Sequence, residues 1–257
     1  MEAPHVFDAH IHPVSLNSQD LESLHFFGVR RVLLFADPLS GGTSKGILAQ
    51  LDALVEVERP RFAKAGLEAF VAVGIHPRSV PRRGLNEVLA ALPAYFRGGK
   101  VLALGETGLH LGGEEEEEAF TAQLTLALEL KLRVVVHTPL VEKERRTRRI
   151  LTLLRESEIP PELVLVDHAN GRTVRLITAC GFHAGLTLHP EELSVRDAVA
   201  LIRKLGTGQL ILNSDSGDRA GDFLAVPRAA SLLFKAGLSA KVVERAAWRN
   251  AEAFFGL

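Results

Sequence analysis

Eight short apolar runs, separated by longer segments with helical spacing, constrain the fold of this chain more than any other feature. Each run has three to six residues and is rich in Val, Leu, Ile or Ala. Uninterrupted runs of this length suit parallel strands that are buried on both faces. The predicted strands cover residues 5–9, 32–36, 70–75, 101–105, 134–136, 163–166, 184–188 and 210–213.

The segments between these strands have the spacing of amphipathic helices. Leu85, Val88, Leu89 and Leu92 recur at i, i+3, i+4 and i+7, and further helices are predicted around residues 120–128, 150–154, 195–205 and 239–255. The last of these begins with a Ser that can serve as N-cap. Strand and helix alternate eight times in 257 residues without a linker-like shift in composition. This pattern predicts an α/β protein with one domain over residues 1–257, a (β/α)8 TIM barrel. A doubly wound open sheet is the alternative, and it would place ligands at only one or two strand ends.

Composition narrows the classes of function. The net charge of −1 does not support a nucleic-acid-binding surface, although a local basic patch stays possible. The single cysteine, Cys180, excludes an internal disulfide and a cysteine zinc knuckle, which fits a cytoplasmic protein. No signal-like segment and no run of about 18 apolar residues occurs, so no membrane association is expected. The sequence leaves the oligomeric state open.

A metal-capable or ionisable side chain follows every predicted strand. These residues are His10 and His12, then Asp37, His76, Glu106, His137, His168, His189 and Asp215. In a barrel of this type, the residues after the strands gather at one face, where catalysis occurs. Two histidines spaced two apart on a strand project from the same side, and imidazoles and carboxylates together suit divalent cations. The sequence therefore predicts a metal centre at this end of the barrel.

The same positions carry a resemblance to a known family. Six motifs in chain order resemble the TatD-type metal-dependent hydrolases of the amidohydrolase superfamily, and the similarity extends to residues 250–256. The motifs are Asp8-Ala9-His10-Ile11-His12, Val73-Gly74-Ile75-His76-Pro77, Gly105-Glu106-Thr107-Gly108-Leu109, Val135-Val136-His137-Thr138, Asp167-His168 and Ser214-Asp215.

The resemblance implies a site for two divalent cations. One ion would be held by His10, His12, Glu106 and Asp215, and the other by Glu106, His137 and His168, with Glu106 as the bridge. Zn²⁺, Mn²⁺ and Mg²⁺ are the candidate ions. Such a pair lowers the pKa of a shared water from about 16 toward 7, which makes hydroxide available at neutral pH. Asp215 is expected to orient this water and to pass its proton to the leaving group.

Other residues are candidates for binding substrate or for supporting the ligands. His76 is expected to line the substrate pocket. Arg145 and Arg146, in a basic segment after the fifth strand, and Arg172, after the sixth, are candidate contacts for a phosphate or carboxylate. Asp8 shares a face with His10 and is expected to orient its ring.

Departures from the family pattern leave the substrate open. His110 stands where the family usually has an acidic residue, and the loops at residues 169–171 and 216–218 differ from the usual ones. The leading hypothesis is a dinuclear-metal hydrolase of phosphoesters, of the nuclease or phosphoesterase type, with a small-molecule or phosphoester substrate. The alternatives are hydrolysis of an amide, lactone or carboxyl ester by the same centre, and a non-catalytic metal-binding protein of a pathway.

Overall fold

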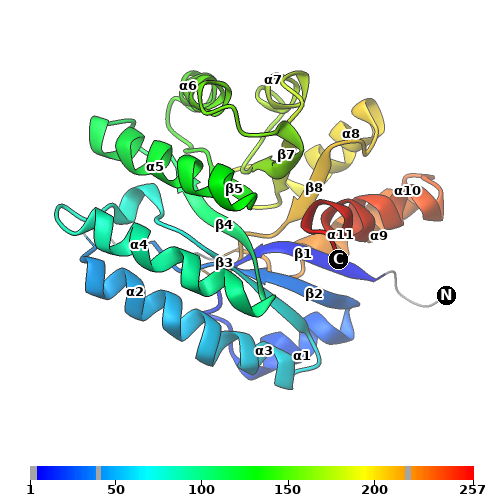
Figure 1. Cartoon of the computed structure of the whole chain (residues 1–257). Coiled ribbons are helices and arrows are strands. Elements are labelled where there is room, and N and C mark those ends of the chain that lie inside the picture. Colours follow the sequence, from blue (N-terminus) through cyan, green and yellow to red (C-terminus); the bar gives the residue numbers. More distant parts are fainter. Residues whose placement is uncertain (1–4, 39–41, 218–220) are drawn as a thin grey trace.

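The computed structural model describes residues 5–38, 42–217 and 221–257. Eight parallel strands form one sheet in sequential order, with the helices on its outside (Figure 1). The strands are β1 (Val6–Ile11), β2 (Val29–Leu34), β3 (Glu68–Val73), β4 (Val101–Gly108), β5 (Arg133–His137), β6 (Val164–Val166), β7 (His183–Thr187) and β8 (Leu210–Asn213). All eight predicted strands overlap these elements, and the TIM-barrel prediction is confirmed.

The helices lie between the strands, as the hydrophobic spacing predicted. They are α1 (Ser18–Phe26), α2 (Ser44–Ala53), α3 (Arg59–Lys64), α4 (Leu85–Tyr95), α5 (Glu114–Leu130), α6 (Lys143–Glu156), α7 (Val174–Ala179), α8 (Val195–Leu205), α9 (Ala225–Lys235), α10 (Ala240–Glu244) and α11 (Asn250–Phe255). The π-helical turns η1 (Leu54–Glu58) and η5 (Arg245–Arg249) join α2 to α3 and α10 to α11. Shorter 3-10 turns are η2 (Pro77–Ser79), η3 (Phe96–Gly98) and η4 (Pro161–Leu163). Within the described ranges, no helix is both long and apolar enough to cross a lipid bilayer.

Contacts between β1 and the segment after β8 bring the two ends of the sheet together. The backbone N–H of Asp215 donates to the carbonyl of His10 at 3.1 Å, and that of His12 donates to the carbonyl of Ser216 at 2.8 Å. Ile11 and Ser216 form a parallel bridge. This near closure excludes the doubly wound open sheet, whose first and last strands do not meet. It also ties the segments that carry two predicted metal ligands directly to each other.

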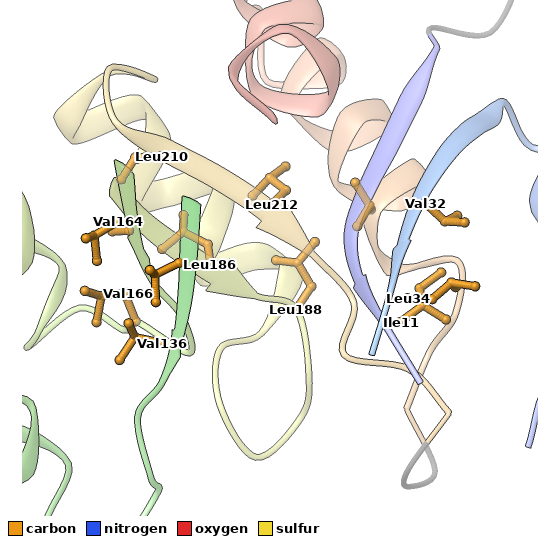
Figure 2. Close-up of a cluster of buried hydrophobic side chains, with 14 of the residues drawn as sticks. Ile11, Val32, Leu34, Val136, Val164, Val166, Leu186, Leu188, Leu210 and Leu212 are labelled. Atoms are coloured by element: carbon orange, nitrogen blue, oxygen red, sulfur yellow. The ribbon is translucent and has the colours of Figure 1, made fainter. Parts of the chain in front are cut away.

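The side chains of the strands divide between two cores. One core lies outside the sheet, where residues such as Val136, Val166 and Leu186 pack toward the helices (Figure 2). The second fills the barrel with alternate residues of the strands, including Phe7 of β1 and Leu165 of β6. This alternation decides which residues point inward at the strand ends.

The C-terminal helical segment closes the interior core at one end. Trp248 and Phe255 pack against Phe7, with ring centroids 6.1 and 5.7 Å away. The segment is one predicted helix interrupted by the π turn η5. Ser239 occupies the predicted N-cap position, but its side chain accepts no capping hydrogen bond, so that detail of the prediction is wrong.

Candidate metal centre

An irregularity in β1 turns His10 into the mouth of the barrel. Asp8 pairs with Val32 and Ile11 with Leu34, so the β1 segment contains one more residue than its partner on β2. Ala9 belongs to the interior core, whereas Ile11 packs in the outer core. The side chains that point into the barrel before residue 9 therefore alternate with the opposite phase after it, which is the effect of a β-bulge. The His10 ring consequently lies inside, stacked on Phe35 with centroids 3.9 Å apart.

A second irregularity places Glu106. On β4, Leu104 pairs with Val134 and Thr107 with Val136, so this part of β4 contains one more residue than the facing part of β5. Ala103 lies in the interior core, and simple alternation would point residue 106 outward. The extra residue re-aims the carboxylate toward the barrel axis, where it is buried. Bulges on two strands thus bring their ligand candidates to one point.

Left-handed backbone conformations position two further side chains. His168 has a φ of 56° and Asp215 a φ of 48°, values that non-glycine residues seldom adopt. His168 lies three residues after the interior Leu165, whereas Asp215 lies four residues after the interior Ile211. Without the turn in the backbone, the His168 side chain would point away from the interior, whereas alternation alone already directs Asp215 inward. Such conformations persist where the surrounding structure enforces them, and they cluster at functional sites.

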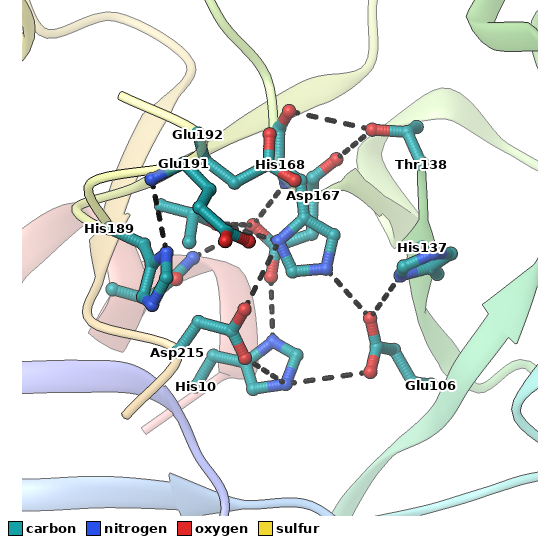
Figure 3. Close-up of polar contacts among 12 residues, drawn as sticks. His10, Glu106, His137, Thr138, Asp167, His168, His189, Glu191, Glu192 and Asp215 are labelled. Atoms are coloured by element: carbon teal, nitrogen blue, oxygen red, sulfur yellow. Dashed lines mark hydrogen bonds and ion pairs between the residues drawn. The ribbon is translucent and has the colours of Figure 1, made fainter. Parts of the chain in front are cut away.

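Glu106 is the centre of the polar cluster at the barrel mouth (Figure 3). Its Oε1 lies 2.9 Å from Nδ1 of His137 and 2.8 Å from Nε2 of His168. Its Oε2 lies 3.6 Å from Nε2 of His10 and 3.7 Å from Nε2 of His76. The two carboxylate oxygens therefore face different pairs of histidines, which is the arrangement that a bridging carboxylate requires.

His12 and Asp215 complete the cluster on the side of β1. The Nε2 atoms of His10 and His12 lie 3.2 Å apart. Asp215 Oδ1 is 3.7 Å from the first of these atoms and 3.3 Å from the second. Asp37, in the segment after β2, has a carboxylate oxygen 3.7 Å from Nδ1 of His12.

The ligand atoms form three overlapping sets, each within 4.8 Å, that could hold a cation. The sets are His10, His12 and Asp215; His10, Glu106 and His168; and His76, Glu106 and His137. All six ligands implied by the resemblance are therefore brought together, and His76 joins them. Among the described residues, Nε2 of His137 is buried without a hydrogen-bond partner, so this ring has a nitrogen left for a ligand. The donor types and their convergence fit divalent cations.

Asp167 orients the first histidine. Its carboxylate is fully buried, and Oδ2 accepts from Nδ1 of His10 at 2.9 Å. Oδ1 accepts from the backbone N–H of His168 at 2.8 Å and from the side-chain amide of Asn213 at 2.8 Å. The Thr187 hydroxyl lies 3.3 Å from Oδ1 and also contacts Nδ1 of His168 at 2.9 Å. These contacts hold Nδ1 of His10 protonated and leave its Nε2 lone pair toward the cluster.

Asp8 does not perform this role, so the prediction that it orients the His10 ring is wrong. Its Oδ1 accepts the backbone N–H groups of Ser214 at 2.9 Å and of His10 at 3.4 Å. Burial raises the pKa of Asp8 to about 7, although the hydrogen bonds from Ser214 oppose the rise. The signal for the correct residue was available, because Asp167 lies two residues after the interior Leu165 and immediately before His168.

The electrostatics of the cluster favour positive charge at its centre. Burial alone would raise the pKa of Glu106, but the charges of His10 and His137 hold it well below its usual value. Burial would likewise lower the pKa of His12 and His168, whereas the neighbouring carboxylates raise them to about 9 and about 10. Buried carboxylates that draw protons onto histidines in this way provide the same stabilisation to a cation that replaces those protons.

A small pocket of about 150 Å³ opens onto the cluster. Beyond the metal-ligand candidates, its lining includes Arg78, His110, Leu140, Val141 and Glu192. His76 is among the residues that line this pocket. The histidine at position 110 is held by its backbone N–H, which donates to Glu116 at 2.6 Å. Glu192 receives a hydrogen bond of 2.7 Å from Nζ of Lys143, a buried ion pair that links the loops after β5 and β7.

The predicted basic contacts lie outside this lining. Arg145 is 80% exposed and pairs with Glu142 at 2.6 Å, and Arg146 pairs with the other oxygen of Glu142 at 2.9 Å. Arg172 is exposed near the start of α7. Arg78, which no sequence motif singled out, is the arginine that lines the described pocket. His189, in the loop after β7, is buried, and its Nδ1 accepts the backbone N–H of Glu191 at 3.3 Å. Asp218, in the loop after β8, lies outside the described residues.

Comparison with known proteins agrees with this arrangement. The profile of the family described as TatD related DNase matches residues 7–256. An uncharacterized metal-dependent hydrolase from Methanocaldococcus jannaschii is 32% identical over 253 residues, which cover 98% of this chain and all of the relative. The crystal structure of a TatD-like protein from Archaeoglobus fulgidus superposes with a TM-score of 0.82 at 29% identity, over 98% of this chain and all of the other.

More distant structures share the architecture alone. A lactonase from Listeria monocytogenes has a TM-score of 0.66 at 14% identity, over 98% of this chain and 95% of the lactonase. The family match spans nearly the whole chain and includes every residue of the metal cluster. The chain therefore belongs to the TatD family and is a metal-dependent hydrolase.

Proposed function

We propose that this protein hydrolyses phosphoesters with two divalent cations held on either side of Glu106. The observation that carries the proposal is the position of this carboxylate, whose two oxygens face separate pairs of histidines. Bound cations would lower the pKa of a water molecule and polarise the bond to be broken. Mixed imidazole and carboxylate donors favour Zn²⁺ or Mn²⁺ over Mg²⁺, which prefers oxygen ligands and retained waters.

Asp215 serves as the proton acceptor. Its carboxylate lines the pocket and is 17% exposed, so a water molecule can reach it. Burial would raise its pKa, but the hydrogen bond from His12 and the charges of His10 and His168 hold the pKa well below the usual value. The group is therefore ionised at neutral pH. It accepts a proton from the attacking water and later delivers it to the leaving oxygen.

His76 supports the reaction as a neutral group. Burial lowers its pKa well below the usual value, although the nearby Glu106 opposes this shift. Its Nδ1 accepts the backbone N–H of Arg78 at 3.0 Å, which directs Nε2 toward Glu106 and the pocket. With Nδ1 as the acceptor, the neutral ring carries its proton on Nε2 and can donate a hydrogen bond to Glu106 or to a substrate oxygen.

The proposal is tested with cation-loaded protein on phosphomonoesters, phosphodiesters, lactones and amides. Phosphoester hydrolysis is expected, and Asp215→Asn should reduce kcat by about a hundredfold or more because a general base contributes about 10²–10⁴ in rate. Asp222→Asn is the matched control, since this carboxylate also lies after β8 but pairs with Arg228 at 2.9 Å and belongs to none of the three ligand sets.

Two results would contradict the proposal. One is phosphoesterase activity of Asp215→Asn equal to that of wild type, which would show that Asp215 is not the general base. The other is hydrolysis of lactones or amides without hydrolysis of any phosphoester, which would establish carbonyl chemistry at the same centre.

A further inference from the structure

We propose that the substrate is a small phosphoester with an apolar organic group, which packs on Leu140 and Val141 while Arg78 contacts its anionic part. This inference rests on the proposed phosphoester activity and specifies its substrate class. It follows from the size of the pocket, from the side chains at its mouth and from the distribution of charge around it.

The pocket is too small for a whole organic ligand of ordinary size. Its volume of about 150 Å³ lies below the roughly 300–1,000 Å³ of typical small-molecule sites. The reacting group and the atoms nearest to it fit beside Glu106 and Asp215. The remainder of a larger substrate must therefore lie at the mouth, where the surrounding side chains determine which substituent is favoured.

The mouth has an exposed apolar surface on the loop after β5. Leu140 is 39% exposed and Val141 66% exposed, and both line the pocket together with Pro139. The base of this loop is fixed, because the Thr138 hydroxyl donates to the carbonyl of Asp167 at 2.7 Å and Lys143 donates to the carbonyl of Thr138 at 3.1 Å. An apolar substituent that covers these side chains removes apolar area from water without first ordering the loop.

The charge at the mouth fits one accessible anionic group. Within the described parts of the chain, Arg78 is the only lysine or arginine that lines the pocket, and no described carboxylate lies within ion-pair distance of its guanidinium. The nearby Lys143 is committed to Glu192. Binding a nucleic-acid strand depends on several phosphate contacts and on aromatic side chains that stack on bases. A single free arginine beside an aliphatic surface instead fits a small ester with an apolar substituent.

Binding of two phosphonates to the cation-loaded protein tests the apolar contact without requiring turnover. Phenylphosphonate and methylphosphonate carry the same anionic group and differ in the organic substituent. Isothermal titration should show that the phenyl compound binds about tenfold more tightly to wild type, from the apolar area that it covers. The double variant Leu140→Ser, Val141→Ser should lose this preference. Leu111→Ser is the control, because Leu111 is equally exposed on the neighbouring β4 loop but does not line the pocket.

The role of Arg78 is tested with the same ligands. Arg78→Ala should weaken both phosphonates by about tenfold, the usual range for a charge-assisted hydrogen bond, and Arg78→Lys should restore part of the loss. Arg82→Ala removes an exposed arginine four residues away that does not line the pocket, and it should leave both affinities unchanged.

The outcomes separate this inference from the proposed function. If phosphoesters are hydrolysed but the two phosphonates bind equally, or the variants bind like wild type, the substrate class is wrong and the activity stands. Faster cleavage of oligonucleotides than of small aryl phosphoesters would also overturn the substrate class. If neither phosphonate binds and only lactones or amides are hydrolysed, the phosphoester activity itself fails.

Discussion

Replacing Asp167 by Asn tests how the metal centre is organised. The substitution conserves volume and keeps Oδ1, which accepts from His168 and Asn213. It replaces Oδ2, which accepts from Nδ1 of His10 at 2.9 Å, by an amide that can only donate. If the amide introduced at position 167 were flipped, its NH2 group would instead face the two groups that donate to Oδ1, the His168 N–H and the Asn213 amide. His10 is therefore expected to move its proton to Nε2, the atom that faces Glu106 and Asp215.

The expected result is a loss of cation affinity by about 10- to 100-fold, the usual effect of removing a residue that supports a metal ligand. At about 1.4 kcal/mol for each factor of ten, this corresponds to roughly 1.4–2.8 kcal/mol of binding free energy. Titration calorimetry of Zn²⁺ or Mn²⁺ into the cation-free protein measures the affinity, and ¹⁵N NMR of the imidazole nitrogens reports the tautomer of His10.

Asp8→Asn is the matched control, because Asp8 is equally buried beside His10 but accepts only from Ser214 and from the His10 backbone. The cation affinity of Asp8→Asn is expected to stay within about threefold of wild type, since Asp8 makes no hydrogen bond to the His10 ring and its pKa of about 7 leaves the carboxyl about half neutral at pH 7. Unchanged affinity and tautomer in Asp167→Asn would refute the reasoning. A large loss in Asp8→Asn alone would assign the orienting role to Asp8.

Three further predictions address the same cluster. Elemental analysis should show that Glu106→Ala has lost one or both cations. Glu117→Ala, which removes only a surface ion pair with Arg149, should retain both. The same cation content in the two variants would exclude the bridging role of Glu106. Gly185→Ala should destabilise the protein by about 1–3 kcal/mol in urea unfolding because its Cβ would overlap Asp167 Oδ1, while Gly208→Ala has open space and should not. Cation affinity should rise as pH rises from 6 to 9, because His12 and His168, with pKa values of about 9 and about 10, must each release a proton when a cation binds. Calorimetry in buffers of different ionisation enthalpy counts the protons released. An affinity that does not change with pH would contradict the prediction.

The barrel itself could be predicted because each strand is an uninterrupted apolar run. Burial on both faces leaves this clear trace in sequence, and the positions of the chemistry follow from the rule that strand ends meet at one face. His137 illustrates the simplest case, since it lies two residues after the interior Val135 and points inward by alternation alone. His76 follows Phe70 and Ala72 in the same way.

Other features depended on backbone geometry that leaves no comparable trace. Regular alternation would direct Glu106 outward, and only the extra residue in β4 turns it to the centre. His168 depends on a positive φ value that is enforced by surrounding contacts rather than by its own preference. Residue spacing along one strand therefore could not establish which ligands meet.

The surroundings of the ligands were the least predictable part. Alternation from Leu165 places Asp167 inside the barrel, but its partner His10 lies 157 positions earlier in the chain, so no local pattern identifies the pair. The cluster of arginines after β5 attracted attention by its composition, yet Arg145 and Arg146 are held by Glu142 from the same helix start. Arg78 stands alone in sequence and lines the pocket because it lies on η2, which begins just after His76 at the end of the β3 segment.

The central claim is that two divalent cations lie on either side of Glu106, and anomalous diffraction from crystals grown with Mn²⁺ tests it most directly. The arrangement of the histidines predicts two anomalous peaks about 3.5–4 Å apart, each within bonding distance of a different oxygen of that carboxylate. A single peak, or two peaks that share no contact with Glu106, would contradict the claim.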